Sequence, residues 1–224
     1  MMTRRQANIG LAKIGLLAAA STAASGTSTA SEVKIKQLPP ARTAGGKPLI
    51  EALHLRRSIR EYADRPIDAQ MLSDLLWSAY GVNRATGDRT APYWRHVMVI
   101  DVFAVMANGT WLYDPQRHAL VPHLPDDLRA KTGLQEFVAS APLNLVYVAH
   151  GERMTDVSAE DRRLFASADA CFIGQNVYLF CASEGLATVF RGAVDQKALG
   201  QAMKLGADQF VTFAQTVGYP KQIG

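Results

Sequence analysis

The stretch Leu143-Asn144-Leu145-Val146-Tyr147-Val148-Ala149 indicates where the centre of the sheet lies. It is almost entirely apolar, and only Asn144 interrupts it. A strand that is buried on both faces has a nearly continuous hydrophobic sequence, whereas a strand with one solvated face alternates. Residues 143–149 are therefore predicted to be a central strand of the sheet.

Further elements are predicted on both sides of this strand. Helices and strands mix without a strict strand–helix–strand alternation, which favours an α+β layered sheet over a doubly wound one. No GxGxxG motif follows a strand, so the dinucleotide-binding fingerprint is absent. The predicted strands are 97–105, 188–190, 210–217 and a hairpin of 111–113 with 119–121. The predicted helices are 49–57, 69–80 with Asp68 as its cap, 126–131, 158–185 and 195–205.

Length and charge limit the class of protein. A chain of 224 residues is long enough for one domain with a real core, and we place that domain at 49–224. Residues 31–48 are rich in Ser, Thr, Pro and Gly and are predicted to be a linker or arm. Beyond residue 30 there are 21 basic and 20 acidic residues, so no nucleic-acid partner is expected. No Cys-x-x-Cys or His/Cys spacing indicates a metal site.

Residues 1–30 have the features of an export signal. Arg4 and Arg5 open the segment, a weakly apolar stretch follows at 9–24, and small residues suited to signal peptidase follow at 28–30. The paired arginines are similar to a twin-arginine (Tat) signal. The apolar stretch is too short and too rich in Ala and Ser for a stable membrane span. The expected location is periplasmic or secreted, and a disordered tail is the alternative.

A candidate anion site lies just after the first predicted helix. In Arg56-Arg57-Ser58-Ile59-Arg60-Glu61-Tyr62 the side chains of Arg56, Ser58 and Arg60 share one face if the run is extended. Two guanidinium groups that flank a hydroxyl suit a phosphate monoester, because arginine offers a planar fork of donors and a permanent charge. The alternative is a solvated helix end paired with Glu61 or Asp64.

Several stretches together resemble the flavin-dependent nitroreductases, especially the group that includes the SagB-type dehydrogenases. The resemblance runs from about Leu49 to Tyr219 and depends on the order and spacing of its parts. These parts are Arg56–Arg60, Asp74–Val82 followed by Arg89–Pro92, Tyr113–Pro115 with His118–Leu120, Gly174–Leu179 followed by Glu184–Thr188, and Val217–Pro220.

The resemblance implies an α+β fold with a mixed, largely antiparallel sheet flanked by helices, in an intertwined homodimer. It implies one FMN per site and hydride transfer from a reductant such as NAD(P)H to a small flat acceptor of the nitroaromatic or quinone type, or oxidation of a small substrate. Because NAD(P)H is scarce outside the cytoplasm, an exported enzyme would need another donor. The residues that the resemblance assigns to cofactor binding are Arg56, Arg57, Ser58, Arg60, Gln135, Arg191 and Gly192.

The chain departs from the family pattern after Thr90-Ala91-Pro92. The family commonly has a small polar loop there that reaches the partner subunit's flavin, and this chain has Tyr93-Trp94-Arg95-His96-Val97-Met98. Two alternatives therefore stay open. One is a flavin-less or flavin-sequestering dimer that binds a small ligand, and the other is a dehydrogenase acting on a peptide-derived ring. No catalytic side chain is assigned, because the flavin carries the redox chemistry.

Overall fold

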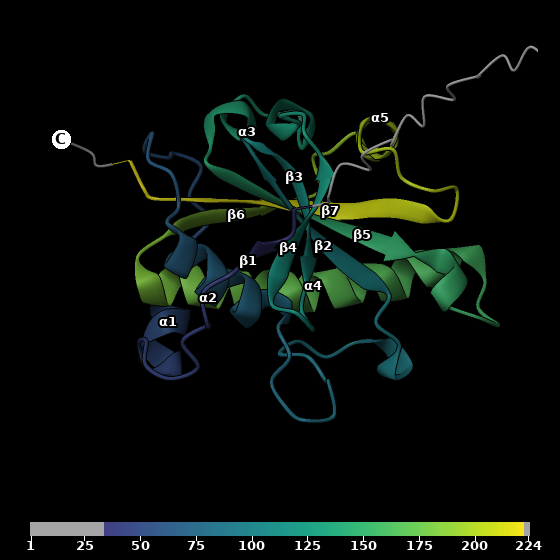
Figure 1. Ribbon diagram of the computed structural model, residues 1–224, viewed down its shortest axis with the longest axis horizontal. Coiled ribbons are helices and arrows are strands. Elements are labelled where there is room, and N and C mark those ends of the chain that lie inside the picture. Colours follow the sequence, from purple (N-terminus) through teal and green to yellow (C-terminus); the bar gives the residue numbers. More distant parts are fainter. Residues whose placement is uncertain (1–33, 222–224) are drawn as a thin grey trace, which may run out of the picture. The chain divides into compact units, whose positions relative to one another are not determined.

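A seven-stranded sheet organises the part of the chain that the computed structural model describes, residues 34–221 (Figure 1). The strand order is β1-β4-β3-β2-β5-β7-β6, and every neighbouring pair is antiparallel. The α+β class and the antiparallel character are confirmed. The strands are β1 (Lys36–Gln37), β2 (Ile100–Met106), β3 (Gly109–Asp114), β4 (Ala119–Leu124), β5 (Leu143–His150), β6 (Ala187–Arg191) and β7 (Gln209–Gly218).

The predicted central strand is confirmed as β5. It lies between β2 and β7, and all eight of its residues are buried. Its side chains alternate between two cores: Leu145 and Tyr147 belong to the core on one face of the sheet, and Val146 and Val148 belong to the other. Apolar residues fill all positions of β5 except Asn144 and His150, because helices cover both faces of the sheet.

The helices divide between these two faces. Figure 1 shows α1, α2 and α4 on one side of the sheet and α3 and α5 on the other. The helices are α1 (Leu49–Leu55), α2 (Ala69–Tyr80), α3 (Phe137–Ser140), α4 (Ala159–Glu184) and α5 (Gln196–Ala202), with single 3-10 turns η1 (Trp94–His96), η2 (Arg129–Lys131) and η3 (Gly151–Arg153).

The ends of α4 follow from local sequence. The hydroxyl of Ser158 accepts a hydrogen bond from the N–H of Asp161, and Gly185 ends the helix with a φ of 74°. Only glycine adopts that left-handed conformation without steric cost, so the stop is encoded locally. By length and composition α4 could cross a membrane, but a buried core helix passes the same test. Ile173 and Val177 of α4 are fully buried in the core between this helix and the sheet.

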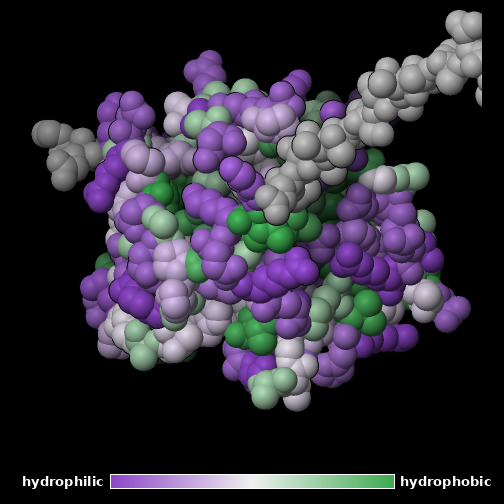
Figure 2. Space-filling view, viewed as in Figure 1, coloured by the Kyte–Doolittle hydropathy of each residue, from purple (hydrophilic) through white to green (hydrophobic). Residues whose placement is uncertain are grey.

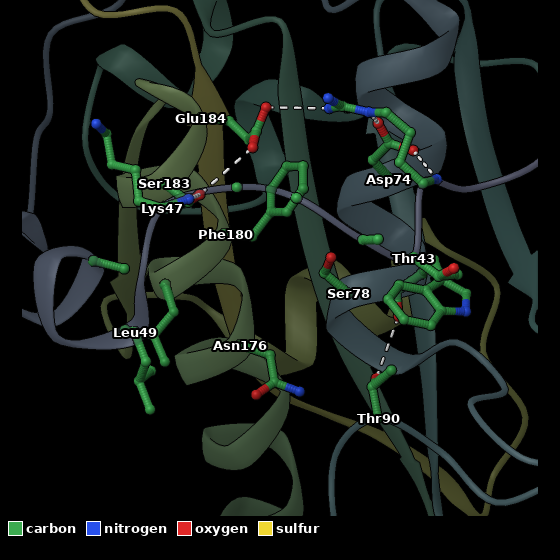
Figure 3. Close-up of a pocket in the computed structure, with 17 residues that line it drawn as sticks. Thr43, Lys47, Leu49, Asp74, Ser78, Thr90, Asn176, Phe180, Ser183 and Glu184 are labelled. Carbon is green, nitrogen blue, oxygen red and sulfur yellow. Dashed lines mark hydrogen bonds and ion pairs between the residues drawn. The ribbon is translucent and has the colours of Figure 1, made fainter.

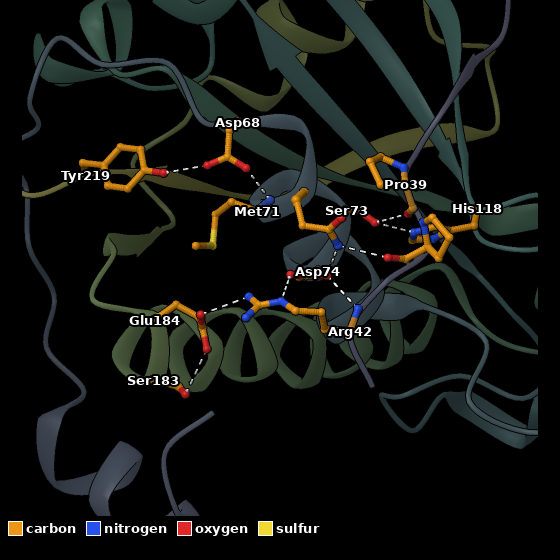
Figure 4. A network of polar contacts seen from close by, with 12 residues as sticks. Pro39, Arg42, Asp68, Met71, Ser73, Asp74, His118, Ser183, Glu184 and Tyr219 are labelled. Carbon is orange, nitrogen blue, oxygen red and sulfur yellow. Dashed lines mark hydrogen bonds and ion pairs between the residues drawn. The ribbon is translucent and has the colours of Figure 1, made fainter. Parts of the chain in front are cut away.

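The segment 34–48, predicted to be a linker or arm, runs along the body of the domain (Figure 4). β1 pairs with β4, and Leu38 is buried. The N–H of Arg42 donates to Asp74 at 2.8 Å, and its guanidinium reaches Asp74 at 2.5 Å and Glu184 at 3.1 Å. This arm therefore joins α2 to the C-terminal end of α4.

One predicted helix is wrong. Residues 126–131 form only the single turn η2. The carboxylate of Asp127 accepts the backbone N–H of Arg129 at 3.0 Å and also binds its guanidinium at 2.8 Å. An aspartate that satisfies a backbone donor two residues later stabilises a turn and competes with helix formation. The predicted export segment, residues 1–30, lies outside the described residues.

Candidate functional site

Arg56 and Ser58 converge on one tyrosine of α4. The Arg56 guanidinium carbon lies 5.3 Å from the centre of the Tyr178 ring. The Tyr178 hydroxyl accepts the N–H of Phe190 at 2.9 Å and lies 2.8 Å from Ser58 Oγ. Tyr178 therefore connects β6 to Ser58, and when its hydroxyl donates to Ser58, the proton of the serine is available for an external acceptor.

The other two arginines of the run differ in their surroundings. The guanidinium of Arg57 turns back and donates to the carbonyl oxygens of His54 at 2.7 Å and Arg56 at 2.9 Å. It therefore satisfies carbonyl groups at the end of α1. Arg60 is exposed, and within residues 34–221 it forms no ion pair or hydrogen bond. The structure thus brings Arg56 and Ser58 together and leaves Arg60 free in solvent.

Gln135 and Gly192, far apart in sequence, lie on adjoining segments. The N–H of Leu134 donates to the carbonyl of Ala193 at 3.0 Å, which holds the two segments side by side. The Oε1 atom of Gln135 is buried and has no hydrogen-bond partner within the described residues. Gly192 is exposed, and a Cβ atom there would meet only Phe213, at 3.7 Å. This end of β6 thus offers an unpaired acceptor beside open backbone.

The side chain of Arg191 points into the protein. Only 3% of the residue is exposed, and burial lowers the pKa of its guanidinium to about 10. Each nitrogen donates to a different segment: Nε to Thr216 Oγ1 at 3.1 Å, Nη1 to the Thr132 carbonyl at 2.8 Å, and Nη2 to Asn144 Oδ1 at 3.1 Å. Arg191 therefore fixes the end of β6 from inside the protein.

Strand β6 connects the two groups. The N–H of Ile59 donates to the Thr188 carbonyl at 3.0 Å, so the Arg56–Arg60 run lies beside the strand. Gly192 lies four positions after Thr188, which is a span of about 13 Å at 3.3 Å per residue. Through Ile59 and Tyr178 the Arg56–Ser58 group stands beside Thr188–Phe190, and Gly192 and Gln135 stand just beyond the end of the strand. The arrangement suits an elongated ligand with an anionic end.

The bulky loop that departs from the family pattern packs largely on its own chain. The Trp94 ring stacks on Phe165 of α4 with centroids 5.8 Å apart. The backbone N–H of Trp94 donates to the Asp169 carboxylate at 2.9 Å. Tyr93 packs edge-on against Tyr80. The exposed residues of the loop are Arg95 and His96, which have positive φ values of 43° and 59°.

The Asp169 carboxyl, which accepts the backbone N–H of Trp94, makes the stability of the protein depend on pH. Burial raises the pKa of its carboxyl to about 6, and the hydrogen bond from Trp94 opposes that rise. A carboxyl with a raised folded-state pKa binds more protons folded than unfolded between about pH 4 and 6. Stability should therefore fall as the pH rises through this range.

We expect Asp169→Asn to remove this part of the pH dependence, because the amide oxygen still accepts the Trp94 N–H but carries no charge. The measurement is the free energy of unfolding in urea from pH 4 to 7. Parallel pH profiles for the wild type and Asp169→Asn would contradict the assignment.

A separate cavity of about 360 Å³ lies between the arm, α1, α2 and α4 (Figure 3). Trp77 and Phe180 supply apolar surface, and Asn176 and Ser78 supply polar groups. None of the seven predicted cofactor-binding residues lines it. This cavity was not predicted from the sequence, because its wall includes the arm, whose docking depends on Arg42, Asp74 and Glu184.

A cluster of possible metal ligands lies at the C-terminal end of β5. Ligand atoms of His150, Glu152 and Asp208 all lie within 4.8 Å of one another. His150 Nε2 lies 2.6 Å from Asp101, and Asp208 accepts the N–H of Glu152 at 2.7 Å. His150 is thus engaged by Asp101, and Asp208 by the main chain of Glu152, so these groups take part in a polar network at this end of the sheet.

Comparison with known proteins gives a consistent result. The nitroreductase family matches residues 53–219. The "Putative nitroreductase MJ1384" of Methanocaldococcus jannaschii is 33% identical over 168 residues, covering 70% of this chain and 84% of that protein. A crystal structure of a "putative nitroreductase" from Ralstonia eutropha JMP134 has 40% identity and a TM-score of 0.80, covering 84% of this chain and 90% of that one.

The NADPH:FMN oxidoreductase from Vibrio harveyi, solved in complex with NAD+, shares the fold at 22% identity. Its TM-score is 0.57, and the match covers 78% of this chain and 69% of that one. The family match spans most of the chain, and the Methanocaldococcus and Ralstonia relatives cover most of its length. The chain therefore belongs to the nitroreductase family, and it is an oxidoreductase of the flavin type.

Proposed function

We propose that the protein binds FMN along β6 and transfers hydride from a reductant such as NAD(P)H to a small flat acceptor of the nitroaromatic or quinone type, or oxidises a small substrate. The observation that carries the proposal is the placement of Arg56 and Ser58 beside Thr188–Phe190 of β6 and of Gly192 and Gln135 just beyond the end of that strand. The membership of the SagB-type group stays a prediction.

The Arg56–Arg60 run and the pair Gln135 and Gly192 fit the phosphate and the ring that FMN would present. Within residues 34–221, Arg56 and Arg60 form no ion pair, so both can receive a phosphate. Among residues 34–221 no donor reaches the buried Oε1 of Gln135, and a ring N–H could supply one. The open position at Gly192 lets a flat ring approach the main chain.

A hydrogen-bond chain prepares Ser58 for an anion. The Phe190 N–H donates to Tyr178, the Tyr178 hydroxyl can donate to Ser58, and Ser58 can then donate to a phosphate oxygen. Donors linked in this way polarise one another. FMN, when bound, would supply the hydride chemistry, and the chain would supply its position. In the single chain Trp94 is held on Phe165 and does not cover this site.

A homodimer is part of this proposal. Helix α4 exposes a stripe at intervals of three and four residues: Leu164, Ala168, Cys171, Phe172 and Gln175. Leu164 is 61% exposed and Phe172 is 49% exposed. The face seen in Figure 2 is mostly hydrophilic with small apolar areas. Helix α1 also exposes apolar side chains, at Leu49, Ile50, Leu53 and Leu55, and we assign the α4 stripe to the contact with a second copy.

We expect Phe172→Glu to convert the dimer to monomers, because it places a charge in the proposed contact. Light scattering after size-exclusion chromatography measures the mass, and Ile35→Glu, at an exposed residue of the arm, is the control. A wild-type monomer, or a dimer that persists in Phe172→Glu, would refute this interface.

We further propose that residues 1–30 direct export through the Tat route. Exchanging Arg4 and Arg5 for lysine should leave the protein in the cytoplasmic fraction of the native host. An unchanged distribution between cytoplasm and periplasm would contradict the assignment. If the protein works outside the cytoplasm, its electron donor is a reductant other than NAD(P)H.

The test of FMN use is the visible spectrum of the purified full-length protein. A yellow protein that releases FMN on denaturation, in a ratio near one per chain, would support the proposal. A colourless protein that stays colourless with added FMN would favour the flavin-less ligand-binding dimer.

A further inference from the structure

A second cavity, of about 170 Å³, lies on the same side of the sheet as α2 but away from β6. Its polar lining comes from separate segments: Tyr80 from the end of α2, Arg89 from the loop that follows, Tyr113 from β3, and Asp101 and Arg153 from β2 and η3. None of the seven predicted cofactor-binding residues takes part.

Arg89 is a buried cation without a matching anion. Only 6% of the residue is exposed. Within the described residues its guanidinium makes a single hydrogen bond, from Nη1 to the Gly87 carbonyl at 3.2 Å, and Nε has no partner. No carboxylate of the described chain lies within ion-pair distance of it. A buried charge is costly unless it is paired, so this guanidinium needs a counter-ion.

Tyr80 adds a second unpaired donor to the same cavity. It is 2% exposed, and its hydroxyl has no hydrogen-bond partner within the described residues. Burial raises the pKa of this hydroxyl well above its usual value, so it keeps its proton and can donate. The Arg89 guanidinium carbon lies 5.6 Å from the centre of the Tyr80 ring.

The one acid in the lining is already engaged. Asp101 accepts from His150 at 2.6 Å and from Arg153 at 3.2 Å. These contacts lower the pKa of Asp101 against the effect of its burial, so it remains ionised and paired. Arg153 also donates to the Met98 carbonyl at 2.8 Å. The unmatched charge in the cavity is therefore the positive charge of Arg89.

We propose that this cavity binds a small oxyanion, of the size of phosphate or a short carboxylate, through the Arg89 guanidinium and the Tyr80 hydroxyl. A water molecule takes up about 30 Å³ of liquid, so the cavity holds such an ion with a few waters. It is too small for a nucleotide or another ligand that needs about 300 Å³ or more. Because Arg89 opens the segment that leads into the Tyr93–Met98 loop, the bound ion would stabilise the root of that loop.

The test is isothermal titration calorimetry of the full-length protein with inorganic phosphate and, separately, with acetate, against chloride at constant ionic strength. Arg89→Gln should weaken binding by at least about tenfold, because it removes a charge-assisted contact. The matched control is Arg117→Gln, which removes an exposed arginine of the β3–β4 turn and should bind as the wild type does. The anion that binds tighter identifies the ion class.

Two further variants keep the test decisive. Tyr80→Phe removes only the unpaired hydroxyl, so it should fold with unchanged stability in chloride and still bind phosphate several-fold more weakly. Arg56→Ala should retain this binding, which separates the cavity from the proposed FMN site. The proposal is overturned if neither anion binds the wild type, or if Tyr80→Phe binds both anions as tightly as the wild type. Anion binding that Arg56→Ala abolishes would also overturn it.

Discussion

Arg56→Ala is expected to weaken FMN binding by at least about tenfold. Arg56 is half-buried over Tyr178 and forms no ion pair within the described residues, so its charge is available to a phosphate. A charge-assisted hydrogen bond contributes about 1.5–3 kcal/mol, which corresponds to a factor of ten or more in the dissociation constant. Fluorescence titration of the flavin-free protein with FMN gives this constant.

The control for this experiment is Arg57→Ala. It removes the same charge one residue away, from a guanidinium that caps the carbonyl groups of His54 and Arg56. We expect Arg57→Ala to weaken FMN binding less than Arg56→Ala. Equal losses would show that the general charge of the run matters and that the position of Arg56 does not.

Arg191→Ala is expected to lower the free energy of unfolding by about 2–4 kcal/mol. The substitution leaves a cavity and takes away three buried hydrogen bonds, to Thr216, Thr132 and Asn144. Urea denaturation followed by circular dichroism measures the loss. Arg191→Met, which keeps most of the volume, separates the packing loss from the hydrogen-bond loss.

These variants also distinguish the two arginines by role. Since the Arg191 guanidinium faces the protein interior, folded Arg191→Met should bind FMN more tightly than Arg56→Ala does. If Arg191→Met is as stable as the wild type, the buried hydrogen bonds contribute nothing net and our view of Arg191 as an internal anchor is wrong.

Local signals explain what the sequence predicted well. The apolar run 143–149 identified β5, and Ser158 and Gly185 set the ends of α4 by capping chemistry that needs no distant partner. The hairpin predicted from residues 111–113 and 119–121 is confirmed as the antiparallel pair β3 and β4.

Features that depend on distant contacts were beyond sequence reasoning. The strand β1 is two residues long and exists only because it pairs with β4. The direction of the Arg191 side chain depends on acceptors from three separate segments. The Tyr80–Arg89 cavity combines residues of α2, a loop, β2, β3 and η3, and no spacing in the sequence marks them as neighbours.

The most direct test of the account is a crystal structure of the full-length protein with FMN. We predict that the phosphate lies within hydrogen-bond distance of Arg56 and Ser58, with the ring over the main chain of Gly192 and near Gln135. A phosphate bound elsewhere, or a site filled by Trp94 in the presence of excess FMN, would contradict it.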